Sequence, residues 1–183
     1  MSGAEFRPQV PPPPQADPID YMTFMLGAEE YGVAIARVQE VRSWEKVTRI
    51  PNAPAYVSGV LNLRGVIVPV IDLRLRLGKP FRAYIKETVV IIFRTLISAR
   101  ERCIGVVVDS ICGVLSVAAA EIRQEPASGA RQSIEFVAGS INSKGKKVML
   151  LDVDSLPHRS HVDQETRARV GSTDFGPASE RRG

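Results

Sequence analysis

The side chains that most often carry out catalysis are few in this sequence, and they do not form pairs. Its two histidines, His158 and His161, fall in a polar stretch near the C-terminus, where we expect no rigid pocket to orient them. Four aspartates each follow an apolar run, a place where a carboxylate usually caps a turn or a helix: Asp72, Asp109, Asp152 and Asp154. No two of these carboxylates have a spacing that favours general acid–base catalysis.

Other catalytic and metal-binding patterns are absent from the sequence. It contains no GxSxG, P-loop, HExxH or GxGxxG motif, and its serines have no matching histidine. Cys103 and Cys112 lie in apolar runs without a CxxC pair, so we predict packed, reduced thiols and no zinc site. The sequence therefore favours a binding module over an enzyme and predicts no cofactor.

The charge balance is mildly basic, with 24 lysines and arginines against 20 aspartates and glutamates in 183 residues. This balance permits contact with nucleic acid or an anionic membrane but does not require it. The basic residues are dispersed, and the densest group, Lys144, Lys146 and Lys147 around Gly145, is typical of a hairpin tip. Aromatic residues make up 6% of the chain and fall mostly in apolar runs, which favours core packing over base stacking. We therefore expect no nucleic-acid partner.

No targeting or membrane-spanning segment is evident in the sequence. No apolar run reaches the roughly 20 residues that a membrane helix needs. The first residues lack the charged and apolar regions of a signal peptide. We therefore expect a cytoplasmic protein that does not insert into a membrane.

Residues 59–78 set the pattern for the rest of the chain. Residues 60–63 and 66–71 are apolar and rich in β-branched side chains, which predicts two strands, the second buried on both faces. Arg64 and Gly65 lie between these runs, and glycine adopts a positive φ at no steric cost. We therefore expect a tight turn that joins the two strands in a hairpin.

Three residues limit the second strand of this hairpin. Pro69 cannot donate to a sheet ladder, so the strand is expected to have an edge or a bulge there. Asp72 occupies the position of a helix N-cap, and Gly78 ends the helical turn that follows. The stretch therefore predicts strand, turn, strand and one capped helical turn.

Further short strands are expected on both sides of this stretch, at residues 21–26, 31–35, 47–50, 87–94, 102–108, 111–117, 136–142 and 147–151. Residues 36–41 are expected to form a short helical turn, and residues 95–102 a turn or a long hairpin tip. Nine or ten short strands without a long helix predict an all-β barrel or sandwich. The part up to about Gly78 resembles the rest in its order of elements, which indicates two similar small barrels.

The two ends differ in composition from this body. Residues 1–18 are rich in proline, with a run at residues 11–14, and residues 158–183 are polar without apolar periodicity. We expect disordered tails at both ends, although the proline run could also be a polyproline ligand for a partner. The predicted folded body spans residues 19–157, and Pro157 limits any last helical turn capped by Asp152.

Several long segments of this body closely resemble the CheW family of chemotaxis coupling proteins. They are residues 31–41, 47–54 and 59–74, continued at residues 105–109 and 114–118. The resemblance covers residues 20–156. It implies two SH3-like five-stranded β-barrels packed around a shared apolar core, with no enzymatic activity.

The resemblance also implies partners and a mechanism. Members of the family bridge the cytoplasmic tip of methyl-accepting chemoreceptors to the regulatory domain of the histidine kinase CheA, within membrane-associated receptor arrays. Receptor helices dock between the barrels and kinase domains dock at barrel ends. Other CheW copies are further partners in array rings.

Six residues match positions that the family uses for binding. Val38, Glu40, Val60, Arg64 and Val114 are expected at or near the receptor contact, and Arg123 at the kinase contact. Core burial is the alternative for each valine. For Glu40 the alternative is a solvated face, with Arg37 and Arg42 as the neutralising neighbours. Arg64 is expected to pair with a carboxylate or carbonyl and to set the relation between the barrels.

Three departures from the family pattern limit what the resemblance implies. The chain after Arg123 lacks the usual proline-rich apolar continuation, residues 96–102 are longer and more basic than a minimal hairpin, and Pro157 cuts a terminal helix. Two other functions therefore stay open. One is a CheW-like adaptor of a non-flagellar pathway, such as one controlling type IV pili, and the other is a basic SH3-like barrel that binds nucleic acid.

Overall fold

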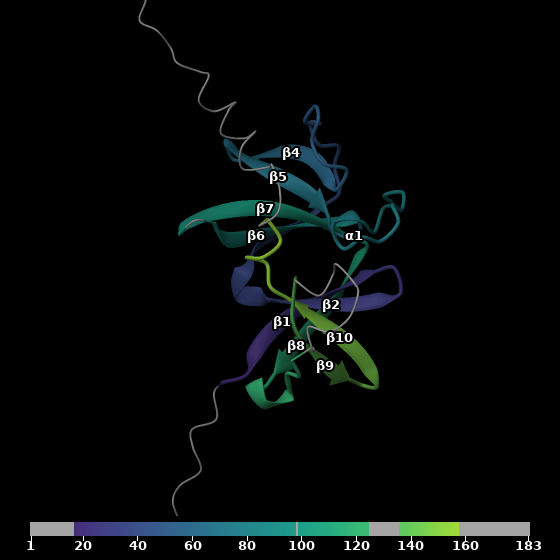
Figure 1. The fold of residues 1–183 in the computed structure, drawn as a ribbon, viewed down its shortest axis with the longest axis vertical. Helices are drawn as coiled ribbons and strands as arrows, with labels where there is room; N and C mark the ends of the chain where they lie inside the picture. The colour runs from purple at the N-terminus through teal and green to yellow at the C-terminus, as the bar shows by residue number, and fades with distance from the viewer. Residues whose placement is uncertain (1–16, 98, 125–135, 158–183) are drawn as a thin grey trace, which may run out of the picture.

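The computed structural model describes residues 17–97, 99–124 and 136–157, which fold into two five-stranded barrels stacked on one another (Figure 1). Barrel A has the strand order β8 (Ser110–Val117), β1 (Ile19–Leu26), β2 (Glu29–Ala34), β10 (Lys146–Leu151) and β9 (Val137–Ser143). Barrel B has the order β3 (Val38–Ser43), β6 (Val89–Ile97), β7 (Arg100–Val108), β5 (Val66–Asp72) and β4 (Val57–Leu63). The helical elements that lie wholly within the described residues are α1 (Leu73–Arg76) and the 3₁₀ turns η1 (Ile35–Arg37) and η2 (Ala119–Glu121). The expected all-β fold of two barrels is confirmed.

The chain order of the barrels differs from the expected division near Gly78. Barrel B is one continuous segment, β3 to β7, whereas barrel A combines β1 and β2 with β8 to β10. The two parts of barrel A meet where β2 pairs with β10 in parallel and β1 pairs with β8 antiparallel. One barrel is therefore inserted into the other, and the similar order of elements in the two halves did not mark a boundary.

The two predicted hairpin turns have the geometry that their residues favour. Arg64 and Gly65 both have positive φ, 52° and 87°, between the paired residues Leu63 and Val66. Lys144 and Gly145 repeat this pattern at the tip of the β9–β10 hairpin, with φ of 51° and 78°. Two consecutive positive φ values are typical of a type I′ turn, whose twist matches that of the flanking strands.

The hairpin ends as predicted, but its second strand is less buried than expected. Val66 and Ile67 are 58% and 48% exposed, so burial on both faces is wrong for the first half of β5. β5 pairs with β7 only from Val70 to Asp72. Pro69 therefore lies where the strand has a partner on one side, which explains how the sheet accommodates it.

Asp72 caps α1, as the sequence predicts. Its carboxylate accepts hydrogen bonds from the backbone N–H groups of Arg74, at 2.9 Å, and Leu75, at 3.4 Å. Gly78 follows the helix with φ of 70°, a conformation that glycine adopts without strain.

Three local predictions were wrong. Residues 38–41 belong to strand β3 and not to a helical turn, because the 3₁₀ turn ends at Arg37. Residues 95–102 are mostly strand: β6 continues to Ile97 and β7 begins at Arg100. The strand expected at residues 47–50 is reduced to a single bridge between Thr48 and Val60.

The cysteines are free, but only one is packed as expected. Cys103 is half-buried and its thiol donates to Gln39 Oε1 at 2.9 Å, whereas Cys112 is exposed on β8. Burial raises the pKa of both thiols, so neither is an activated nucleophile.

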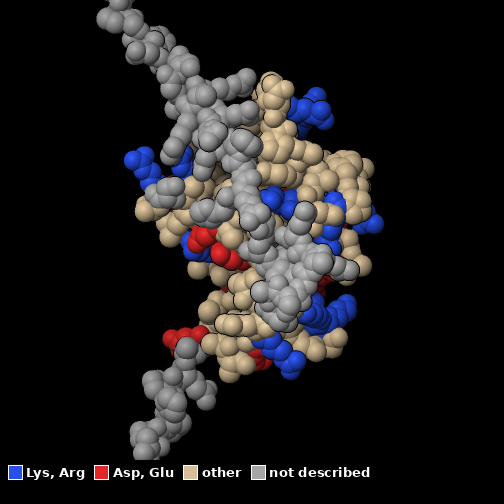
Figure 2. All heavy atoms as spheres, viewed as in Figure 1, with Lys and Arg blue, Asp and Glu red and all other residues tan. Residues whose placement is uncertain are grey.

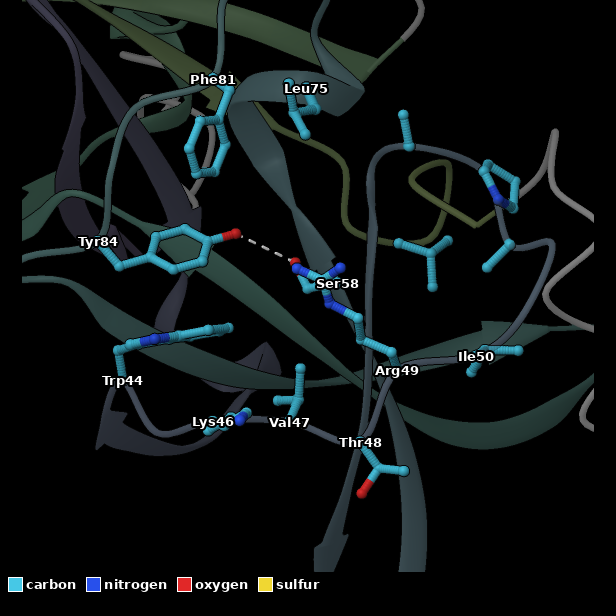
Figure 3. Close-up of a pocket in the computed structure, with 14 residues that line it drawn as sticks. Trp44, Lys46, Val47, Thr48, Arg49, Ile50, Ser58, Leu75, Phe81 and Tyr84 are labelled. Carbon is cyan, nitrogen blue, oxygen red and sulfur yellow. Dashed lines mark hydrogen bonds between the residues drawn. The ribbon is translucent and has the colours of Figure 1, made fainter.

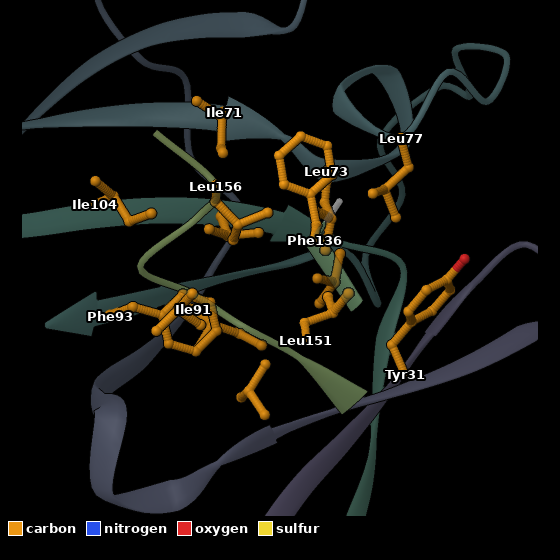
Figure 4. Packing of buried hydrophobic residues seen from close by; sticks show 14 of the residues in the cluster. Tyr31, Ile71, Leu73, Leu77, Ile91, Phe93, Ile104, Phe136, Leu151 and Leu156 are labelled. Carbon is orange, nitrogen blue, oxygen red and sulfur yellow. The ribbon is translucent and has the colours of Figure 1, made fainter. Parts of the chain in front are cut away.

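The main apolar core lies between the barrels and not inside either one (Figure 4). Strand β6 shows why, because its side chains alternate between two clusters. Ile91 and Phe93 join the shared cluster with Tyr31 of barrel A, whereas Val90 and Ile92 fill barrel B. A third, smaller cluster fills barrel A. The shared apolar core expected from the resemblance is therefore present, and it holds the two barrels together.

A buried polar cluster crosses the same junction. Arg74, 3% exposed, lies 3.4 Å from Asp72 and 2.8 Å from Asp109, as measured from its guanidinium nitrogens to the carboxylate oxygens. Asp109 also accepts a hydrogen bond from the backbone N–H of Gly27, in the β1–β2 turn, at 2.6 Å. Arg74 and Asp109 therefore link α1 of barrel B to a turn of barrel A.

The buried Tyr31 predicts a loss of stability at alkaline pH. Burial raises its pKa far above the usual value of 10, and the hydrogen bond that its hydroxyl donates to Glu29 Oε2 at 2.6 Å adds to the shift. The unfolded chain therefore ionises this tyrosine before the folded protein does. The contribution of the Tyr31 hydroxyl to the free energy of unfolding is fully present below pH 10. It is lost as the pH rises further, by at most about 1.4 kcal/mol per pH unit.

Urea unfolding from about pH 9 to about pH 11 checks this prediction. In Tyr31→Phe, the fall of the unfolding free energy with pH should be shallower than in the native sequence. A smaller slope is expected to persist, because burial also raises the pKa of Tyr21 and Tyr84. Equal slopes in the two proteins would contradict the prediction.

Candidate interaction surface

An ion pair joins two of the predicted binding residues. Arg64 Nη2 donates to Glu40 Oε2 at 3.1 Å, from the β4–β5 turn to strand β3. The Glu40 side chain is 22% exposed and that of Arg64 is 81% exposed, so the glutamate is held against the protein while the arginine reaches into solvent. Since β3 and β4 are the two ends of the barrel B strand order, the pair bridges the seam where this barrel closes.

The neutralising partner of Glu40 differs in part from the expectation. Arg42 Nε lies 3.8 Å from Glu40 and is a secondary partner, while it also pairs with Glu45 at 3.0 Å. Arg37 pairs instead with Asp154. Arg64, which is 24 residues away along the chain, is the closer partner of Glu40.

Arg64 pairs with a carboxylate as expected, but it does not set the relation between the barrels. Both partners of its ion pair belong to barrel B. Two aspartates elsewhere connect the barrels. Asp109 does so by accepting the Gly27 N–H. Asp154 pairs with Arg37 and accepts the Leu96 N–H at 2.8 Å.

The three predicted valines occupy different environments. Val38 is half-buried and packs against the shared core, so it contributes mainly to the packing between the barrels. Val60 is half-buried and exchanges backbone hydrogen bonds with Thr48, at 2.8 and 3.0 Å. Val114 is 64% exposed on β8, in barrel A, opposite Met22. Val114 is the valine whose exposure suits a direct contact with a partner.

Arg123 lies at the end of barrel A, apart from the ion pair of barrel B. Its backbone N–H and C=O both bond to Ser140 of β9, each at 2.8 Å, and its side chain is exposed. A Cβ on Gly139 would lie 2.9 Å from the Arg123 carbonyl oxygen, so glycine permits this close approach. The segment whose sequence departs from the family pattern begins just after Arg123. Its residues 125–135 lie outside the part of the chain that the structure describes.

Sequence reasoning missed three exposed apolar side chains on β3 and β5, the strands next to the ion pair in the chain. Val41 follows Glu40 on β3 and is 40% exposed, and Val66 and Ile67 follow the turn that holds Arg64. The β-branched run 66–71 reads as a buried strand, so its exposed beginning gave no signal. Large exposed apolar side chains on the same barrel as an exposed charged pair are features that protein-binding surfaces combine.

On the side visible in Figure 2, the charged side chains of the described residues do not gather into a broad basic face. Figure 2 shows Lys and Arg spread over both barrels on the visible side, with Asp and Glu among them. Among the described residues, no group of three His, Cys, Asp or Glu side chains could hold a metal ion. In that same part of the chain, no helix is long and apolar enough to cross a membrane.

Comparisons with known proteins place these features in a family. The family model for the CheW-like domain matches residues 20–160. "Chemotaxis protein CheW" of Klebsiella aerogenes is 40% identical over 138 residues, which cover 75% of this chain and 80% of the relative. The protein of the same name from Bacillus subtilis is 31% identical over 135 residues, covering 74% and 84%.

A solved structure shows the same fold. The crystal structure of scaffolding protein TtCheW from Thermoanaerobacter tengcongensis matches with a TM-score of 0.69 at 31% identity. The match covers 76% of this chain and 92% of that one.

Proposed function

This chain belongs to the CheW family of chemotaxis scaffold proteins, which are not enzymes, and from this we propose that it couples methyl-accepting chemoreceptors to the regulatory domain of CheA. The coupling would take place in the cytoplasm, at receptor arrays, through the CheW-like domain of residues 19–157.

The Glu40–Arg64 pair is the observation that carries the proposal. Two residues proposed for the receptor contact, 24 positions apart in sequence, meet at 3.1 Å on the surface. The pair presents an exposed guanidinium, and the strands that carry it or follow it in the chain also expose Val41, Val66 and Ile67. An exposed charge that fixes orientation, on a barrel that also exposes apolar side chains, suits the docking of a helical partner.

The proposed mechanism is interfacial and not chemical. A rigid core and the Arg74–Asp109 link hold the two barrels in one arrangement, so a partner bound to barrel B and one bound to barrel A are connected mechanically. A receptor whose two signalling states bind the adaptor unequally would shift the kinase equilibrium by that difference in affinity. In this proposal Val114 adds to the receptor contact, and Arg123 contacts the kinase from the end of barrel A.

We expect Glu40→Lys and Arg64→Ala each to weaken binding of a receptor cytoplasmic fragment by about tenfold or more. Arg64 is largely exposed, so its replacement should change the unfolding free energy by no more than about 0.5 kcal/mol. Titration of each folded variant with the fragment checks these expectations.

Arg94→Ala is the matched control, because Arg94 is also an exposed arginine of barrel B that pairs with a glutamate, Glu101, at 3.8 Å. It should bind like the native sequence. If Glu40→Lys and Arg64→Ala bind receptor and kinase domain unchanged, the site assignment is wrong. Receptor fragments from flagellar and type IV pilus pathways, together with an oligonucleotide, give the three arms that separate the proposed function from its alternatives.

A further inference from the structure

Barrel B carries an open groove that the proposed adaptor function does not use (Figure 3). Its volume is about 970 Å³. Its lining comes mainly from the connection between β3 and β4, which carries Trp44, and from the connection between α1 and β6, which carries Phe81 and Tyr84. The groove therefore lies on loops fixed to the barrel and faces solvent.

Three aromatic rings form one side of the groove. The ring centroids of Trp44 and Tyr84 are 4.1 Å apart, and Phe81 contacts Tyr84 edge-on at 5.6 Å. The Tyr84 hydroxyl donates to the buried Asp72 at 3.0 Å, so the central ring is anchored. Phe81 is nevertheless 60% exposed. The wall is thus fixed in advance and keeps apolar surface in water, which lowers the entropic cost of binding an apolar ligand.

The rest of the lining gives the groove a positive charge. Figure 3 shows Arg49 reaching toward the aromatic side, with Lys46 beside Trp44 along the chain. Among the described residues that line the groove none is acidic, and neither Lys46 nor Arg49 has an ion-pair partner in the described part of the chain. The groove therefore suits a ligand that combines apolar rings with a carboxylate.

A proline-rich segment has this chemistry. Proline runs adopt an extended left-handed helix before binding, which lowers the entropic cost of ordering them, and aromatic grooves on small domains recognise this helix by packing the pyrrolidine rings. A nearby acidic residue would then meet Lys46 and Arg49.

The chain itself contains such a segment. Four consecutive prolines at residues 11–14 are followed by Asp17, and residues 11–20 hold two aspartates and no basic residue. Pro14 and Asp17 would be about 9 Å apart in a polyproline conformation. The described chain begins at Asp17, two residues before β1 of barrel A, whereas the groove lies on barrel B, so Asp17 of the same chain is held on the other barrel. We propose that the groove binds the proline run and Asp17 of a second copy of this chain.

Trp44 allows a direct test, since it is the single tryptophan of the sequence. Titration of a synthetic peptide of residues 8–20 into the dilute full-length protein should give a saturable change in tryptophan emission. A peptide with alanine at residues 11–14 should give none, and a peptide with Asp17→Lys should bind about tenfold more weakly. Equal binding of the alanine peptide, or no change with the native one, would overturn the proposal.

Variants of the groove separate the site from its surroundings. Phe81→Ala should abolish the emission change, and Lys46→Glu should weaken peptide binding. Ile85→Ala is the matched control, because Ile85 is also 60% exposed on the same connection but does not line the groove. Ile85→Ala should bind like the native sequence, and a loss of binding in this variant equal to that in Phe81→Ala would count against the groove.

Sedimentation equilibrium tests the second copy. The full-length protein should self-associate with increasing concentration, and both Phe81→Ala and alanine at residues 11–14 should abolish this association. The alternative is that alanine at residues 11–14 changes the Trp44 emission of the full-length protein while the native protein stays monomeric at all concentrations. In that case the proline run occupies the groove of its own chain. That result would overturn the assignment to a second copy.

Discussion

Replacing Arg74 by alanine is expected to destabilise the folded protein by about 3–5 kcal/mol, the largest single effect we predict. Its guanidinium lies within 3.4 Å of Asp72 and 2.8 Å of Asp109, and Arg74 and Asp72 are 3% and 0% exposed. Removing the cation leaves buried negative charge without compensation, which costs more than the pair itself contributes. Urea unfolding followed by circular dichroism gives the difference in free energy.

The effect should also reach the junction of the barrels. The Asp109 carboxylate accepts a hydrogen bond from the Gly27 N–H of barrel A. The ion pair with Arg74 fixes the position of this carboxylate. Arg82→Ala is the control, since Arg82 is 68% exposed and lies 4.0 Å from the same carboxylate, so its loss should cost no more than about 0.5 kcal/mol. A change below about 1 kcal/mol in Arg74→Ala would show that the cluster is not a main source of stability.

Gly59→Ala is expected to cost about 2–4 kcal/mol, the second large effect. A Cβ at this position would lie 2.3 Å from the Thr48 carbonyl oxygen, and Gly59 has φ of 148°. Thr48 exchanges two backbone hydrogen bonds with Val60 of β4. The clash would therefore push the segment around Thr48 away from β4. The same segment lines the groove, so Trp44 emission should change as well.

Gly113→Ala is the matched substitution in barrel A. No atom lies within 4 Å of the Cβ that it would add, so it should change stability by about 0.5 kcal/mol or less. Thermal unfolding of the two variants side by side checks the contrast. Similar losses in both would mean that the backbone around Gly59 adjusts to the added atom.

Local chemistry predicted much of the fold. The Asp72 cap, the turn at Arg64 and Gly65 and the hairpin tip at Lys144 and Gly145 depend on a few neighbouring residues, and the structure has each of them. The helical turn predicted at residues 36–41 was wrong because Val38 and Val41 fit one face of a short helix, whereas pairing with β6 makes this segment a strand.

Features that depend on distant residues could not be predicted in this way. The insertion of barrel B into barrel A rests on the parallel pairing of β2 with β10, which no local pattern encodes. The Glu40–Arg64 pair likewise requires two strands that close a barrel. Trp44 gave no signal in sequence, because its groove forms only when two separate connections meet.

The inserted barrel also determines what a ribosome releases first. Synthesis yields β1 and β2, then all of β3–β7, and only later the three strands that complete barrel A. Local contacts form faster than distant ones, so barrel B can fold while β2 still lacks β10 as a neighbour. During that interval the nascent chain exposes open strand edges on β1 and β2, whose partners β8 and β10 come later. Misassembly between neighbouring nascent chains is then most favoured at the β1–β2 hairpin and not at barrel B.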